Sequence, residues 1–276
     1  MKAVSNTVAV TAPAQQPALQ AGVASGLQRR DWIAGLEKGL GILEAFGDAH
    51  PRATAAQMAE IVGITRTAAR RHLLTLAHLG YVATDGKLFW LTPRVLRLGQ
   101  AFIESSRLAR TVQPFLQRVT AGTQEIAYVS MLEGNDIVYV ARNGPTRVMN
   151  TGFVLGARVP AQVTAAGMLL LALRAQPHYT DWLAAQKLPT FTQHTTTDKT
   201  SLGVQMAQIR QQEWAVSEQQ LDLHYRGVAV PLRDARGALV AALSVIMPMQ
   251  GESQEAAVTR VLGVLRETAA AMRSLV

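Results

Sequence analysis

The sequence contains no cysteine among its 276 residues. Disulfide bonds, cysteine nucleophiles and thiolate metal sites are therefore excluded, and the composition suits a reducing compartment. Long apolar runs are also missing. The longest spans residues 165–173, well short of the roughly 18 residues that a membrane-spanning helix needs. We therefore expect a cytoplasmic protein with no membrane partner.

Acidic residues are scarce, since 19 Asp and Glu stand against 27 Lys and Arg, a net charge of +8. The excess is uneven along the chain. Residues 66–110 hold eight Lys/Arg and two Asp/Glu, a net of +6, whereas residues 111–276 hold fourteen and twelve, a net of +2. A clustered positive charge binds polyanions through counterion release. Residues 1–28 have no acidic residue at all, and we expect a disordered extension there.

Sequence motifs of enzymes are missing as well. The six histidines show no HExxH spacing, and neither a G-x-S-x-G elbow nor a phosphate-binding P-loop occurs. The nearby carboxylates Glu218 and Asp222 fall on an expected loop, where solvated side chains are commoner than catalytic ones. We predict a protein without catalytic residues, cofactor or metal. A zinc site built from histidine and carboxylate alone stays open.

The stretch 54–91 predicts helix, turn, helix and a two-stranded hairpin. Thr54 can cap a helix over 55–62, Gly63 can end it, and Thr65 can cap a second helix over 66–79. The dipeptide 85–86, Asp-Gly, lies between two β-prone runs and is a strong hairpin signal. This order is that of a winged helix-turn-helix, which places its second helix in the DNA major groove.

The second helix has two distinct faces. Ala69, Leu73, Leu76 and Ala77 share one face at helical spacing and should pack inward. The other face offers arginine for guanine edges and phosphates, and small side chains for close approach. The alternatives are a helical hairpin with a merely solvated basic face, and a module for RNA or a protein partner. The predicted DNA-binding residues are Thr65, Arg66, Thr67, Ala68, Arg70, Arg71, Thr75 and Lys87.

The sequence pattern changes at residue 126. From there on, β-prone segments alternate with segments of helical periodicity. Expected strands cover 126–132, 136–142, 146–153, 157–160, 214–217, 227–231 and 238–246, and expected helices cover 165–173, 178–186, 198–212 and 254–275. We predict an α+β fold in which helices cover both faces of a mixed sheet. The predicted domains are an extension (1–28), a winged helix-turn-helix (29–92), a linker helix (93–108) and an α+β domain (109–276).

Over nearly all of residues 33–276 the chain resembles the IclR-type bacterial transcriptional regulators. The matching segments are 39–43 (GLGIL), 63–71 (GITRTAARR), 79–82 (LGYV), 91–99 (LTPRVLRLG), 163–167 (VTAAG) and 227–231 (GVAVP). Each segment is weak by itself, but their order and spacing together are specific. Segments 31–40 (DWIAGLEKGL) and 68–76 (AARRHLLTL) are most similar to the branch that regulates the β-ketoadipate pathway and related aromatic-acid catabolism.

The resemblance implies an N-terminal winged helix-turn-helix and a GAF-like mixed α/β effector-binding domain. It also implies homodimers or homotetramers on double-stranded operator DNA, and contact with RNA polymerase in members that activate. Effectors in the family are usually small organic or aromatic acids. We therefore predict a ligand-responsive regulator of aromatic-compound catabolism that binds a small aromatic or dicarboxylic acid. The alternatives are a sensor of a small keto acid and a non-specific nucleic-acid-binding module.

The segment 164–167 predicts an anion site from its residues alone. Small residues at a helix N-terminus leave backbone N–H groups open, and the helix dipole favours a carboxylate. The alternative is that Thr164 only caps the helix and Ser244 only packs in a strand. The resemblance places this motif at the effector pocket, with Phe153 as a further apolar wall, and the apolar Ile246 favours a larger or aromatic ligand. The predicted effector residues are Thr164, Ala165, Ala166, Gly167, Ser217, Tyr225, Gly227, Ser244, Ile246 and Met149.

Overall fold

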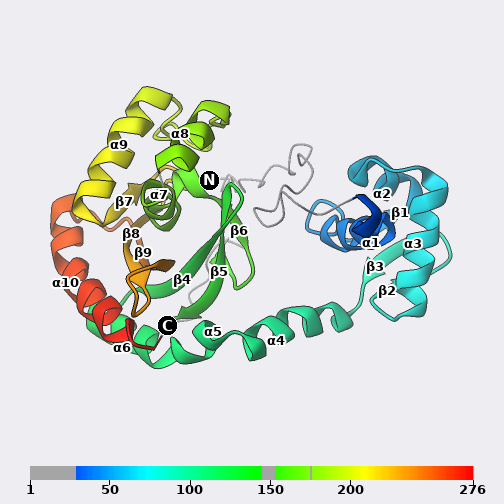
Figure 1. Ribbon diagram of the computed structural model, residues 1–276, viewed down its shortest axis with the longest axis horizontal. Coiled ribbons are helices and arrows are strands. Elements are labelled where there is room, and N and C mark those ends of the chain that lie inside the picture. Colours follow the sequence, from blue (N-terminus) through cyan, green and yellow to red (C-terminus); the bar gives the residue numbers. More distant parts are fainter. Residues whose placement is uncertain (1–28, 145–152, 175, 276) are drawn as a thin grey trace, which may run out of the picture. The chain divides into compact units, whose positions relative to one another are not determined.

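A computed structural model of the protein describes residues 29–144, 153–174 and 176–275. The expected extension 1–28, the predicted effector residue Met149 and most of the expected strand 146–153 lie outside these residues. The chain forms two compact units, the first ending at Ala101 and the second beginning at Phe102. Each unit is described by itself below (Figure 1).

The first unit combines three helices with a small sheet. The elements are α1 (Ala34–Glu44), β1 (Ala53–Thr54), α2 (Ala55–Val62), α3 (Arg66–His78), β2 (Val82–Thr84) and β3 (Leu88–Leu91). The sheet has the order β1-β3-β2, so the predicted hairpin gains a third strand. Sequence reasoning missed β1 because two residues carry no periodicity.

Local hydrogen bonds set the ends of the two central helices. Thr54 and Gln57 form a reciprocal capping box at the start of α2, and Gly63 ends that helix with a φ of +70°. The side chain of Thr65 accepts the N–H of Ala68 at the start of α3. These caps fix the turn between the helices, as the sequence predicts.

The tip of the hairpin is held by one carboxylate. Asp85 Oδ1 accepts the N–H groups of Lys87 (2.9 Å) and Leu88 (2.7 Å), and Gly86 takes a φ of +97°. The two backbone bonds, first from Leu88 and then from Lys87, hold the pKa of Asp85 below its ordinary value. The turn is thus built from the Asp-Gly pair that predicted it.

The chain leaves the first unit through a series of short helices. A 3₁₀ turn, η2 (Pro93–Val95), is followed by α4 (Leu96–Ser105), α5 (Arg107–Thr111) and α6 (Gln113–Thr123). The break before α6 lets Pro114 stand in its first turn, where a missing N–H costs no hydrogen bond. The unit boundary falls inside α4, which buries none of its side chains. The domain limits at residues 92 and 108 stay a prediction.

A six-stranded sheet forms the centre of the second unit. Its strands are β4 (Ile126–Glu133), β5 (Asp136–Asn143), β6 (Arg158–Pro160), β7 (Ala215–Glu218), β8 (Tyr225–Arg233) and β9 (Leu239–Pro248). The order is β6-β5-β4-β9-β8-β7. Every pairing in the described part is antiparallel. The expected mixed sheet is therefore wrong. Four of the five pairs join consecutive strands, and the central pair, β4 with β9, is antiparallel although its strands are far apart in the sequence.

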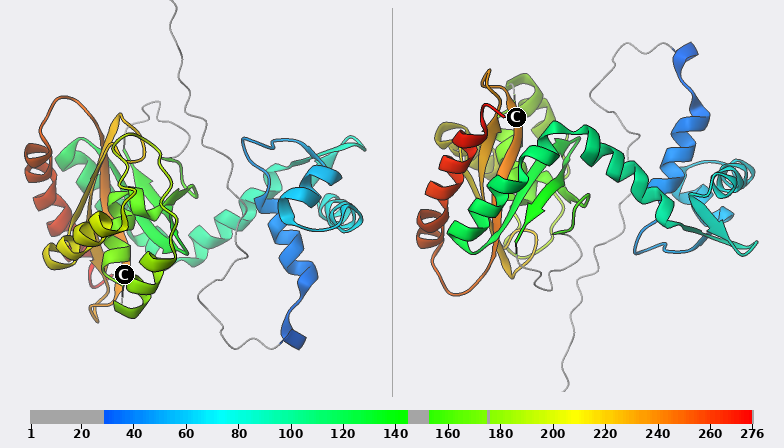
Figure 2. Two further views of the ribbon diagram at one scale, coloured as in Figure 1. Left: turned by 90° about the horizontal axis from the view of Figure 1, so that it is seen from above. Right: turned by 90° about the horizontal axis from the view of Figure 1, so that it is seen from below.

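Helices cover both faces of this sheet (Figures 1 and 2). One layer holds α7 (Ala165–Ala172), α8 (Gln176–Ala185) and α9 (Lys199–Gln212), and the other holds α6 and α10 (Gln254–Met272). All eight residues of α7 are buried, as its uninterrupted apolar sequence predicts. The short turn η4 (Ala161–Val163) leads into α7. The α+β class and the two-part architecture predicted from the sequence are confirmed.

Candidate functional site

Helix α3 separates a buried face from an exposed one. Ala69, Leu73 and Leu76 are buried in the core of the first unit. Of the predicted DNA-binding residues, Thr65, Arg66, Thr67, Arg70, Arg71, Thr75 and Lys87 are exposed and Ala68 is half-buried. The structure thus brings the predicted helix residues to one solvent-facing surface and leaves Lys87 at the hairpin tip.

Two further arginines stand beside this hairpin and were missed from the sequence. The Arg52 guanidinium lies 4.3 Å from the centre of the Trp90 ring, and that of Arg94 lies 5.4 Å from the ring of Tyr81. Both arginines are exposed. Stacking on an aromatic ring restrains a cation without removing its charge. Only the folded hairpin reveals these pairs, because each partner comes from a different segment.

A pocket of about 440 Å³, counted out to its mouth, lies in the second unit. It sits between the N-terminus of α7 and strands β7, β8 and β9. Eight of the predicted effector residues line it: Thr164, Ala165, Ala166, Ser217, Tyr225, Gly227, Ser244 and Ile246. Gly167 does not line it, and Phe153, expected as apolar wall, does.

The N-terminus of α7 opens into this pocket. The Thr164 hydroxyl accepts the N–H of Gly167 at 3.1 Å and caps the helix. Among the described residues, no acceptor meets the N–H groups of Ala165 and Ala166. The Thr164 side chain is therefore a cap, and the two free N–H groups beside it are the donors available to an anion.

Two glycines let the backbone come close at this corner. A Cβ on Gly167 would lie 2.2 Å from the carbonyl oxygen of Ala161, so no side chain fits between α7 and η4. A Cβ on Gly227 would lie 3.4 Å from the Cβ of Ala165. Gly167 thus serves the packing that positions the helix N-terminus, rather than the pocket wall itself.

The two pocket serines differ in their hydrogen bonds. The Ser217 hydroxyl donates to the carbonyl of Val163 at 2.7 Å. Ser244 is only 3% exposed, lies on the pocket wall, and its hydroxyl has no partner among the described residues. A buried hydroxyl without a partner is costly unless a ligand or water meets it.

Aromatic rings form one side of the pocket. The rings of Tyr139 and Phe153 lie 6.3 Å apart, and those of Phe153 and Tyr225 lie 5.3 Å apart in an edge-to-face arrangement. Tyr139 was missed from the sequence, where its strand alternation looks like that of any core residue. Burial raises the pKa of Tyr139 well above its ordinary value, so its hydroxyl stays protonated and able to donate.

The loop between β7 and β8 supplies further lining residues, namely Gln220, Leu221 and Asp222. The sequence analysis missed the first two and took Asp222 for a solvated carboxylate. Gln220 is 8% exposed, and its Oε1 accepts the N–H of Thr196 at 3.3 Å. Its Nε2 has no partner among the described residues and is a further donor. The only signal in the sequence was the pair of nearby carboxylates, Glu218 and Asp222, and it did not indicate a pocket.

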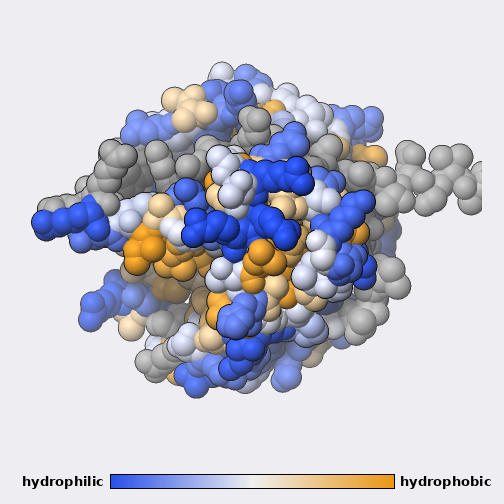
Figure 3. Space-filling model, turned by 90° about the vertical axis from the view of Figure 1, so that its right-hand side faces the viewer, coloured by the Kyte–Doolittle hydropathy of each residue, from blue (hydrophilic) through white to orange (hydrophobic). Residues whose placement is uncertain are grey.

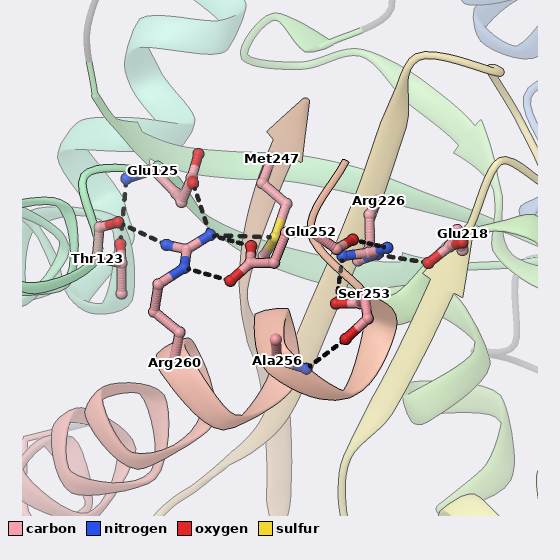
Figure 4. Close-up of polar contacts among 9 residues, drawn as sticks. All are labelled: Thr123, Glu125, Glu218, Arg226, Met247, Glu252, Ser253, Ala256 and Arg260. Atoms are coloured by element: carbon pink, nitrogen blue, oxygen red, sulfur yellow. Dashed lines mark hydrogen bonds and ion pairs between the residues drawn. The ribbon is translucent and has the colours of Figure 1, made fainter. Parts of the chain in front are cut away.

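Two arginines brace the ends of these strands (Figure 4). Arg226 is 4% exposed, and its guanidinium donates to Glu218 on β7 and to the carbonyls of Glu252 and Ser253 before α10. Arg260 on α10 meets the carboxylates of Glu252 and Glu125 at 3.0 Å. Arg226 appears among the lining residues, but its side chain is committed to this network and not to the pocket.

The described residues contain no cluster of His, Asp and Glu that could hold a metal ion. Nor does any helix in that part of the chain combine the length and apolar character that crossing a membrane requires. The features that remain are the exposed basic helix of the first unit and the pocket of the second. A chain that carries both features has the make-up of a DNA-binding protein with a unit that senses a small molecule.

The chain belongs to the IclR family of bacterial transcriptional regulators. Residues 35–86 match the IclR helix-turn-helix domain, and residues 100–274 match the C-terminal domain of bacterial IclR transcriptional regulators. The family match confirms the predicted family and confirms a regulator rather than an enzyme.

Named relatives and a solved structure support this assignment. The chain is 36% identical to the p-hydroxybenzoate hydroxylase transcriptional activator of Acinetobacter baylyi, covering 91% of this chain and 94% of that protein. It is 34% identical to the Pca operon regulatory protein of the same organism, covering 90% and 91%. The inducer-binding domain of the Acinetobacter PobR transcription factor, solved as a double mutant with 3-hydroxybenzoic acid, matches with a TM-score of 0.58 and 29% identity. That match covers 60% of this chain and 98% of that domain.

Proposed function

We propose that this protein regulates genes for the breakdown of aromatic acids, and that its effector is a small aromatic acid bound in the pocket of the second unit. Relatives at 34–36% identity carry names from aromatic-acid metabolism, and the solved PobR domain holds 3-hydroxybenzoic acid. The observation that carries the proposal is the pocket itself. It combines a ring-lined wall with the free N–H groups of Ala165 and Ala166 and the unpartnered hydroxyl of Ser244.

The DNA-reading part of the proposal rests on α3. Arg66, Arg70 and Arg71 would contact phosphates and guanine edges, while Thr67 and Ala68 let the backbone approach the bases. The Thr75 hydroxyl donates to the carbonyl of Arg71, so its methyl group rather than its hydroxyl is available outward. Lys87 on the hairpin would meet a neighbouring phosphate. The site of action is then the cytoplasm, where the operator lies.

We further propose that the protein binds its operator as a homodimer. Helix α1 and the residues just before it expose a row of large apolar side chains at helical spacing: Trp32, Ile33, Leu36 and Leu40. An exposed apolar stripe of this kind marks a protein interface. Hydrophilic and hydrophobic side chains mix on the face drawn in Figure 3. Pairing of dimers into tetramers, and contact with RNA polymerase during activation, extend the same proposal.

Thermal unfolding tests the effector assignment. The full-length protein is heated with 4-hydroxybenzoate, 3-hydroxybenzoate, protocatechuate, phthalate isomers, β-ketoadipate or pyruvate. A ligand that binds only the folded state raises the melting temperature by mass action. We expect an aromatic acid to raise it selectively and to change the affinity for a promoter fragment. A shift with pyruvate alone would replace the aromatic effector by a keto acid, and no preference for promoter over random duplex would overturn the regulator assignment.

A further inference from the structure

Arg52 stands just before the short strand β1, outside both the α3 helix and the tip of the hairpin. Strand β1 pairs with β3 so that Ala53 lies opposite Phe89. Both of these side chains are buried in the core of the first unit. Because side chains alternate between the two faces of a sheet, Arg52 and Trp90 share the outer face, which is turned away from that core.

The Arg52 guanidinium is held in place without being neutralised. It lies 4.3 Å from the centre of the Trp90 ring, and tryptophan is the side chain whose ring attracts a cation most strongly. The arginine is exposed, and it makes no hydrogen bond or ion pair with the residues that the structure describes. Its planar fork of N–H groups is therefore restrained and still available to an acceptor.

Two features place Arg52 where a DNA backbone would pass. In a helix-turn-helix the first helix crosses the phosphate backbone, while the second enters the major groove. The first helix here is α2, and Arg52 precedes its cap, Thr54, by two residues. The charge of Arg52 also reaches the hairpin tip, where the pKa of Asp85 is lowered mainly by the backbone N–H of Leu88 and to a smaller extent by Arg52.

The second stacked arginine, Arg94, stands at a different place. Its guanidinium lies 5.4 Å from the centre of the Tyr81 ring, and its Nη1 atom would lie 3.2 Å from a Cβ on Gly80. Gly80 follows the C-terminal end of α3, whereas the N-terminal residues of such a helix approach the bases. Arg52 and Arg94 are both exposed and both stacked, so they differ in place and not in kind.

We propose that Arg52 binds a phosphate of the operator backbone, and that Trp90 is a positioning residue for its guanidinium. An arginine side chain loses rotamer freedom when it grips a phosphate, and the ring restricts that freedom before the DNA arrives. The fork of N–H groups then donates to the phosphate oxygens. Such a contact adds affinity for any duplex and carries no sequence information. The inference rests on the proposed function, since it assumes that α3 reads the operator.

The dependence of DNA affinity on salt tests the role of Arg52. Fluorescence anisotropy of the full-length protein is measured with a labelled random-sequence duplex and with a promoter fragment. Each phosphate contact contributes about 0.9 to the slope of log affinity against log salt concentration, so Arg52→Gln should lower that slope by about this amount on both duplexes. Arg94→Gln is the matched control, because it removes the same charge from an aromatic ring of the same unit; it should leave the slope unchanged.

Replacement of the ring tests the positioning role of Trp90. Trp90→Phe keeps a ring beside the guanidinium and should bind DNA nearly as tightly as the unaltered protein. Trp90→Leu removes the ring and should weaken binding about threefold on both duplexes with an unchanged salt slope, since the charge of Arg52 remains. In an Arg52→Gln background the same replacement should have no further effect on DNA affinity, because a positioning residue acts only through the residue that it holds.

The outcomes that would count against the proposal differ in reach. An unchanged salt slope in Arg52→Gln would overturn the phosphate contact and leave the reading of DNA by α3 standing. An equal loss of slope in Arg52→Gln and Arg94→Gln would assign the effect to net charge instead. Additive effects of Trp90→Leu and Arg52→Gln would end the positioning role. No preference of the unaltered protein for the promoter fragment would overturn the proposed function, and no binding to either duplex would overturn both.

Discussion

The two units place their functional side chains in different ways. In the first unit the predicted DNA-facing residues come from one helix and one hairpin tip, and nearly all are exposed. In the second unit the pocket wall comes from β5, the turn before α7, β7, the loop after it, β8 and β9. Most of these side chains are buried. A surface can thus be specified by spacing along one element, whereas a pocket requires several elements to meet.

This difference explains why substitutions should act locally in one unit and globally in the other. The exposed face of α3 carries no core residue, so its side chains can change without disturbing the fold. The corner at α7 has backbone in contact with backbone, so a single methyl group there displaces a whole layer. The following predictions test that contrast, from the largest expected effect to the smallest.

Gly167→Ala should have the largest effect. The added Cβ would lie 2.2 Å from the Ala161 carbonyl oxygen, and we expect a loss of about 3 kcal/mol in unfolding free energy. Urea unfolding of the second unit measures it. The control is Gly263→Ala on α10, where nothing lies within 4 Å; this change should stabilise the protein by up to about 1 kcal/mol. Equal stability of the two variants would contradict the packing role of Gly167.

Arg71→Ala should weaken binding to the specific operator by about 2 kcal/mol, roughly thirtyfold, because one base-reading contact is lost. The melting temperature and the effector affinity should not change. Electrophoretic mobility shifts on operator and random duplex measure the specific part. Arg236→Ala, which removes an exposed arginine from the second unit, is the matched control. If operator preference survives in Arg71→Ala, Arg71 does not read a base.

Ser244→Ala should weaken effector binding by about 1 kcal/mol, roughly fivefold in affinity, without lowering the free energy of unfolding. The hydroxyl has no partner among the described residues, so its removal breaks no bond of the free protein. Ser217→Ala should cost stability instead, since that hydroxyl donates to the Val163 carbonyl. Calorimetry and urea unfolding of both variants separate the two roles, and a stability loss in Ser244→Ala would assign Ser244 to packing.

The smallest expected effect is a loss of stability at acid pH, and it should be similar in the two units. Backbone N–H groups lower the pKa of Asp85 at the hairpin tip and of Asp198 at the start of α9. Because the pKa of each carboxyl group is lower in the folded state than its ordinary value of 3.8, each carboxylate stabilises the folded protein at pH values above 3.8. This stabilisation is lost as the pH falls through the lowered value. Amide chemical shifts of Lys87, Leu88 and Ser201 below pH 4 measure it, and unshifted amides at either turn would contradict the assignment.

Local signals in the sequence predicted much of the fold. Helix α2 begins and ends where the caps at Thr54 and Gly63 place it, and α3 follows Thr65 in the same way. The wing turn forms at the Asp-Gly pair as expected. The two sheets were harder to predict from the sequence. Strands β4 to β9 were predicted near their observed positions. In contrast, β1 in the first unit and the antiparallel order of the six-stranded sheet depend on partners that no local pattern names.

The residues of the candidate site can also be divided into those that the sequence predicted and those that it did not. Spacing and resemblance pointed to residues 164–167, Ser217 and Ser244, whereas Tyr139 and Gln220 were missed and Asp222 was taken for a solvated side chain. Tyr139 alternates with Ile137 in a strand, and alternation alone does not separate a core residue from a pocket residue. Gly167 was predicted in the wall, and the structure places it against Ala161 instead.

The sequence by itself determined the elements whose energetics are local: the helix caps, the wing turn and the two faces of the α3 helix. Each depends on residues only a few positions apart. The tertiary structure decided the pocket, because its walls meet through pairings such as Tyr128 with Ser244, more than 100 residues apart. Which hydroxyl stays unpartnered, which arginine is committed and which residues line the pocket follow from that long-range packing, since burial and register depend on the whole sheet.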